Sequence, residues 1–123
     1  MEEKNMKDFV TVLLKELKKK HIVTANIEEE SKSVTTEQIK FEKETDLHIR
    51  DAIFGMGTIL KENLDEHYYI TSIKTGLFNN VLVYAIIRRN EDKTADIAVY
   101  AREGIIKQNL AGKAMEKLKK VLC

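Results

Sequence analysis

The side chains in this sequence that could support chemistry are few, and their spacing brings none of them into a recognised catalytic pattern. His48 lies between Asp46 and Asp51, which suggests either a metal site or an acid–base pair. If these residues lie on a helix, however, offsets of two and three residues do not put all three side chains on one face. We therefore interpret Asp46 as a helix N-cap, whose carboxylate accepts from free backbone N–H groups.

Metal and nucleophile motifs are missing from the sequence. No two histidines are three or four residues apart, no C-x-x-C occurs, and the single cysteine is Cys123. There is no G-x-S-x-G motif, and Gly55-Met56-Gly57 lacks the spacing and the Lys-Ser/Thr of a phosphate-binding loop. We expect no cofactor, no metal and no enzymatic activity.

The segment His67-Tyr68-Tyr69 is the best candidate for a small-molecule site. Adjacent residues of a strand point to opposite faces of the sheet, so only one of the two tyrosines can share a side with a given ligand. Tyrosines at strand ends commonly pack across a sheet with the hydroxyl group near water. A binding site or active site that uses His67 and Tyr69 is one alternative reading.

Basic residues form a stripe near the C-terminus. Lys113, Lys117 and Lys120 are spaced by four and three residues, which places them on one face of a helix. The whole chain has 21 basic and 20 acidic residues, a net charge of +1, whereas a dedicated nucleic-acid binder usually carries a clear positive excess. Weak nucleic-acid binding through this helix is therefore a second alternative, and nucleic acid is not the expected partner.

Hydrophobic periodicity predicts the elements that must position these residues. Steps of three and four predict helices, and alternation or short apolar runs predict strands. Asn5 is expected to cap the first helix. The expected elements are a helix over 5–20, strands over 22–29 and 35–45, a helix over 46–64, strands over 68–75, 81–89 and 94–102, and a helix over 105–121.

The strand over 81–89 decides the architecture. Its positions are apolar from Val81 to Ile87, so both of its faces need cover and it belongs in the middle of the sheet. We predict a single α+β domain over 1–123, a three-layer structure of order α-β-β-α-β-β-β-α. Its five-stranded, antiparallel-rich sheet has helices on both faces. This order resembles the roadblock and longin-like group of small dimeric scaffolds, and more distantly the secretion-chaperone fold.

Gly55 and Gly57 fall inside the helix expected over 46–64, where each costs about 1 kcal/mol relative to alanine. One interpretation is that they allow close approach of a second copy, with Ile53, Met56 and Leu60 supplying apolar area. The other is that they let the helix pack tightly on its own sheet or end it early. Leu77 and Phe78, in a predicted turn, are candidate contacts for a partner.

These observations favour a non-enzymatic protein-interaction or regulatory module that acts as a homodimer or binds a small protein partner. The chain has no apolar run long enough to cross a membrane, and its start lacks the apolar segment of a secretory signal. With only one cysteine it also has no intrachain disulfide. We expect a cytoplasmic protein.

Overall fold

The computed structural model describes residues 2–20, 22, 34–40, 46–55, 57–73, 83–90, 93–101 and 110–122. Three helices and five strands lie in these ranges. In chain order they are α1 (Glu2–Lys19), β1 (Val34–Lys40), α3 (Asp46–Phe54), β2 (Gly57–Asn63), β3 (Tyr68–Ile73), β4 (Val83–Arg89), β5 (Thr94–Ala101) and α4 (Leu110–Leu122).

The five strands form one antiparallel sheet in the order β1-β5-β4-β3-β2. Strands β2 to β5 follow one another as a meander, and β1 joins the far side of β5. The registers pair Gln38 with Asp96, and Asp96 with Arg88. Three polar residues of three strands therefore form one row across the sheet.

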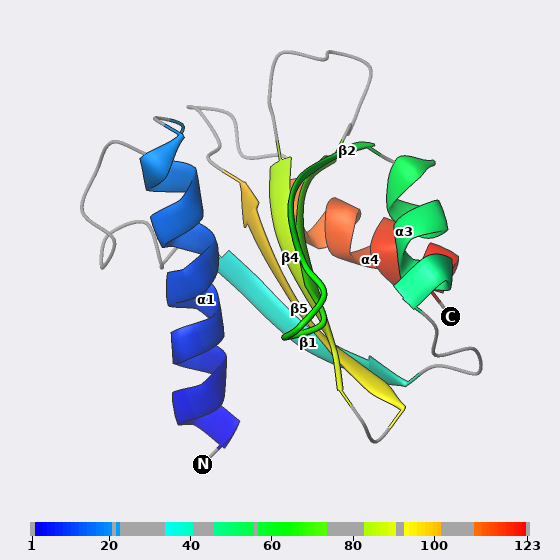
Figure 1. The fold of residues 1–123 in the computed structure, drawn as a ribbon, viewed down its shortest axis with the longest axis horizontal. Coiled ribbons are helices and arrows are strands. Elements are labelled where there is room, and N and C mark those ends of the chain that lie inside the picture. Colours follow the sequence, from blue (N-terminus) through cyan, green and yellow to red (C-terminus); the bar gives the residue numbers. More distant parts are fainter. Residues whose placement is uncertain are drawn as a thin grey trace.

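Helices cover both faces of the sheet, with α1 on one side and α3 and α4 on the other (Figure 1). Each face buries its own apolar cluster. The α1-side core joins Phe9, Leu13, Leu14 and Leu17 of the helix to residues such as Ile70 and Ile86 of the sheet. The second core joins α3 and α4 to the opposite side chains, among them Ile87 and Ile97. The predicted three-layer α+β class is confirmed.

Strand β4 lies in the middle of the sheet, as its sequence predicts. Residues Val83 to Ile87 are all buried. Ile86 belongs to the α1-side core and Val83 to the core under α3 and α4, so the two residues do point to opposite faces.

The helix expected over 46–64 is wrong in its second half. Helix α3 ends at Phe54, Gly55 lies in a turn, and 57–63 form the edge strand β2. The spacing of Leu60 and Leu64 continued the helical period by coincidence. In the strand, Ile59 packs on the core under α3 and α4 and Leu60 packs on the α1-side core, with a shift of register between Ile59 and Lys61.

Two helix ends also differ from the expectation. Helix α1 begins at Glu2, so Asn5 lies within it and does not cap it. Helix α4 extends to Leu122, one residue past the expected end, and Leu122 is buried whereas Val121 is 38% exposed. Val121 and Leu122 lie three and four residues after Leu118, and both spacings fit a helical period of 3.6. The sequence alone therefore does not show which of the two residues is buried. The strand expected over 22–29 lies outside the described residues, apart from Ile22, which is in a bend.

Candidate functional site

A pocket of about 340 Å³ lies between α1 and the sheet. Its lining comes from α1, the β2–β3 turn, β3 and β4. Four lining residues are apolar or aromatic and two are charged, namely Phe9, Val12, Tyr68 and Ile86, and Glu66 and Arg88. Apolar walls with a few placed polar groups are typical of ligand and side-chain binding pockets.

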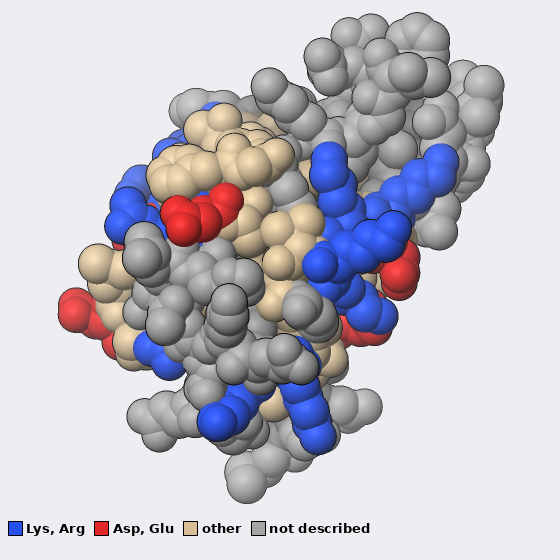
Figure 2. All heavy atoms as spheres, turned by 90° about the vertical axis from the view of Figure 1, so that its right-hand side faces the viewer, with Lys and Arg blue, Asp and Glu red and all other residues tan. Residues whose placement is uncertain are grey.

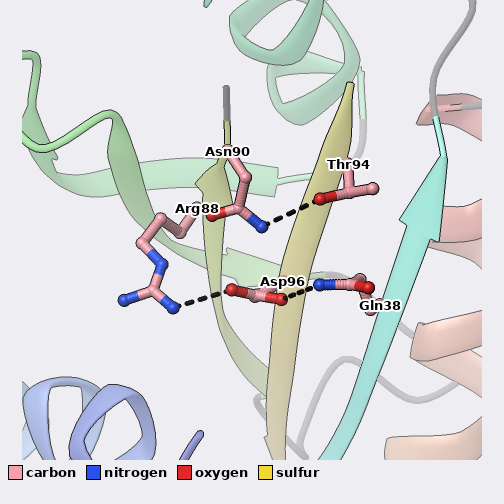
Figure 3. Close-up of polar contacts among 5 residues, drawn as sticks. All are labelled: Gln38, Arg88, Asn90, Thr94 and Asp96. Atoms are coloured by element: carbon pink, nitrogen blue, oxygen red, sulfur yellow. Dashed lines mark hydrogen bonds and ion pairs between the residues drawn. The ribbon is translucent and has the colours of Figure 1, made fainter. Parts of the chain in front are cut away.

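The row of polar residues across β4, β5 and β1 fixes Arg88 in this pocket. The Arg88 Nη2 donates to Asp96 Oδ2 at 2.7 Å, and Gln38 Nε2 donates to Asp96 Oδ1 at 2.9 Å (Figure 3). Beside this row, Asn90 Nδ2 donates to Thr94 Oγ1 at 3.0 Å, across the hairpin that joins β4 to β5. Both oxygens of the Asp96 carboxylate therefore accept a hydrogen bond from a side chain of a neighbouring strand.

Asp96 is a buried charge that depends on its ion pair with Arg88. Asp96 is only 6% exposed, so its charge needs the compensation that Arg88 supplies. The Arg88 guanidinium also lies over the ring of Phe9, with 4.7 Å between its central carbon and the ring centroid. Contacts from a strand and from a helix thus hold the guanidinium in one place before any ligand arrives.

An ion pair fastens α1 to the edge strand β2 beside Tyr68. Lys61 Nζ lies 3.5 Å from Glu16 Oε2 and 6.0 Å from the centroid of the Tyr68 ring. The neighbouring Tyr68, and after it the Glu16 carboxylate, hold the pKa of Lys61 above its ordinary value. This pairing positions α1 relative to Tyr68.

The predicted pair His67 and Tyr69 does not form one site. Tyr69 is fully buried in the core under α3 and α4, whereas Tyr68 belongs to the α1-side core and lines the pocket. His67 occupies the β2–β3 turn with a φ of 56°, and its Nδ1 lies 3.0 Å from Arg89 Nη2. An arginine nitrogen only donates, so Nδ1 is the acceptor.

The predicted lysine stripe is present on α4. Lys113, Lys117 and Lys120 are exposed, and Figure 2 shows lysine and arginine side chains gathered on the side of the molecule that carries α3 and α4. Acidic residues lie beside the stripe, where they pair with the neighbouring Lys119. Lys119 Nζ lies 2.9 Å from Glu37 Oε1 and 3.6 Å from Glu116 Oε1, and the hydrogen bond to Glu37 is the main reason that the pKa of Lys119 is raised.

The residues predicted for self-association are dispersed. Ile53, on α3, is fully buried in the core that this helix covers, Gly55 is exposed, and Leu60 is half-buried on the α1 side. A Cβ built on Gly57 would overlap the carbonyl oxygen of Ser72 on β3, which assigns this glycine to close packing inside the sheet. Met56, Leu77 and Phe78 lie outside the described residues. The premise of a continuous helical face is wrong, and self-association itself stays a prediction.

Of the acidic and histidine residues singled out around α3, the structure describes the side chain of Asp51 but not those of Asp46 and His48. Helix α3 begins at Asp46, the position predicted as its cap, and Asp51 is exposed. No group of three histidine, cysteine, aspartate or glutamate side chains that could hold a metal occurs in the part of the chain that the structure describes. No helix there has the length and apolar character needed to cross a membrane.

Sequence reasoning missed the pocket and the row behind it, although a signal was present. Arg88 continues the alternation of Tyr84 and Ile86, and Asp96 begins that of Ala98 and Tyr100, so both charges fall on core-facing positions. A charge on a core-facing position needs a partner. Comparison with known proteins gives no further guide, because no family model, curated protein or solved structure matches this chain.

Proposed function

We propose that this protein is a non-enzymatic interaction module that receives a side chain of a partner protein, or of a second copy, in the pocket between α1 and the sheet. The observation that carries the proposal is the pocket lining, where an apolar wall surrounds a guanidinium already held by Asp96 and Phe9. Prior fixation of such a group lowers the entropic cost of binding.

The two charged lining residues suit binding better than proton transfer. The Arg88 guanidinium offers N–H donors and no acceptor, which suits the binding of an acceptor group of a partner. Glu66 is exposed at the rim of the pocket. A reducing compartment such as the cytoplasm suits a chain with a single cysteine.

Two exposed valines provide a matched test. Val12 and Val121 are both 38% exposed and both lie on helices, but Val12 lines the pocket on the α1 face and α4 packs on the opposite face. We expect Val12→Glu to abolish partner capture in quantitative affinity purification, or dimer formation in sedimentation velocity. Val121→Glu should leave both unchanged, with both variants folded by circular dichroism.

Equal behaviour of the two variants would contradict the proposal. Nucleic-acid binding through the lysine stripe predicts a different pattern. Binding to mixed DNA and RNA would fall steeply with salt, and Val12→Glu would not affect it.

A further inference from the structure

We infer that the pocket selects a segment of another protein that presents an apolar side chain next to a lysine or arginine. This inference rests on the proposed function and specifies the chemistry of the partner. The apolar walls fit the apolar side chain, and the charge of the rim specifies its neighbour.

Two ionic groups, Glu66 and Arg88, line the pocket. Arg88 and Asp96 neutralise each other across 2.7 Å, so the pair contributes no net charge to the pocket. Glu66 is left as the uncompensated charge, because it makes no ion pair with another described residue, and the same holds for Asp65 beside it. The rim is therefore acidic, and a cation on the partner complements it.

Arg88 adds a second element of recognition. A guanidinium has five N–H donors, and the hydrogen bond described for Arg88 uses one of them, on Nη2. Its Nε is buried without an acceptor among the described residues. The Arg88 side chain is 31% exposed, so its remaining Nη donors can reach a backbone carbonyl of a bound segment.

Two exposed apolar side chains belong to the segments that form the pocket. Val12 lines it at 38% exposure, and Leu64 is 53% exposed in the same turn as Asp65 and Glu66. An apolar residue beside two carboxylates matches a segment with apolar and basic side chains in alternation along one face.

A second copy of this chain fits this role less well. Its lysine stripe on α4 would be the basic element, but α4 and the pocket lie on opposite faces of the sheet (Figure 1). Contacts between unlike faces of identical chains are head-to-tail, and unless the rotation between copies closes a ring they leave a free surface at each end. A segment of a different protein closes the interface after one binding event.

The test uses two fluorescein-labelled synthetic peptides with identical leucine and phenylalanine positions, one with lysines and one with glutamates at the remaining positions. Fluorescence anisotropy at low salt should show at least about tenfold tighter binding of the lysine peptide. The double variant Asp65→Asn, Glu66→Gln should lose this preference while it retains the apolar part of the affinity. Glu116→Gln, a 75% exposed carboxylate on α4, is the matched control and should change nothing.

The outcomes separate this inference from the proposed function. Equal binding of both peptides, lost in Val12→Glu, would leave the pocket as the binding site and overturn the selection for a cation. Preference for the glutamate peptide would overturn it as well. Binding of neither peptide up to about 1 mM, or binding that Val12→Glu does not change, would overturn both the inference and the proposed function. Growth of the protein into long oligomers without peptide would identify a second copy as the occupant and also contradict the inference.

Discussion

Alanine at Gly57 should destabilise the protein, whereas alanine at Gly55 should not. A Cβ at Gly57 overlaps the Ser72 carbonyl oxygen and lies 2.7 Å from the Ser72 carbonyl carbon and 3.1 Å from Ile73 Cα. These are backbone atoms of the paired strand β3, and they cannot rotate away. The new methyl group must push β2 off β3 at the start of their ladder.

The expected magnitude follows from the cost of overpacking. Forcing a methyl group into a packed site costs about 1–3 kcal/mol, which lowers the melting temperature of a domain of this size by about 4–12 °C. At Gly55 the new Cβ meets the carbonyl oxygens of Ala52 and Asp51 at 3.5 and 3.8 Å, which is ordinary contact. Alanine there restricts the unfolded chain and should stabilise the protein by about 0.4–1 kcal/mol.

Urea and thermal unfolding of the two single variants, followed by circular dichroism, measure both effects. The opposite signs are the informative result. If both residues lay inside one helix over 46–64, alanine would stabilise the protein at either position by about 1 kcal/mol. Stabilisation by Gly57→Ala would therefore refute the assignment of β2 and the packing argument with it.

Three further outcomes are expected. Val83→Asp and Ile86→Asp, which place a charge in opposite cores, should each lower the free energy of unfolding in urea by at least about 3 kcal/mol. Near-native stability of either variant would mean that no helix covers that face of the sheet. Lys93 has a φ of 67°, so Lys93→Gly should raise stability by about 0.5–1 kcal/mol, and a loss of stability would count against the left-handed turn. Burial raises the pKa of Tyr84 above its ordinary value of about 10. The contribution of this group to folding stability is therefore fully present below about pH 10 and is lost as the pH rises further. Wild type should therefore lose more stability than Tyr84→Phe between about pH 8 and about pH 11 in urea melts, and parallel losses would contradict this.

Much of the architecture could be predicted because apolar residues report burial directly. The uninterrupted apolar run of β4 predicts its place in mid-sheet, and the alternating residues of β5 divide between the two cores, with Ala95 and Ile97 in one and Ala98 in the other. These patterns depend only on which side of a strand meets a helix. They require no knowledge of which strands pair.

The end of α3 could not be predicted from periodicity. A helix and a strand both accommodate the residues around Leu60, and the choice depends on pairing with β3, a contact between Gly57–Asn63 and Tyr68–Ile73. A glycine that looks costly in a helix is required in this strand, because the Ser72 carbonyl leaves no space for a Cβ. Tertiary context decided between two local preferences.

The candidate site was missed for a related reason. Arg88 and Asp96 are eight residues apart in the chain, and only the register of β4 with β5 sets them side by side. The ring of Phe9, which contacts the Arg88 guanidinium, belongs to α1 near the start of the sequence. A search for motifs of fixed spacing finds none of these contacts, whereas a search for charges on core-facing strand positions would find both Arg88 and Asp96.

The claim that the pocket between α1 and the sheet is the binding surface is tested most directly by amide chemical shifts. Titration of the lysine-bearing peptide into ¹⁵N-labelled protein should shift the resonances of Val12, Glu66, Tyr68 and Arg88, and these shifts should vanish in Val12→Glu. Shifts confined to Lys113 and Lys117 on α4, or no shifts at all, would contradict the account.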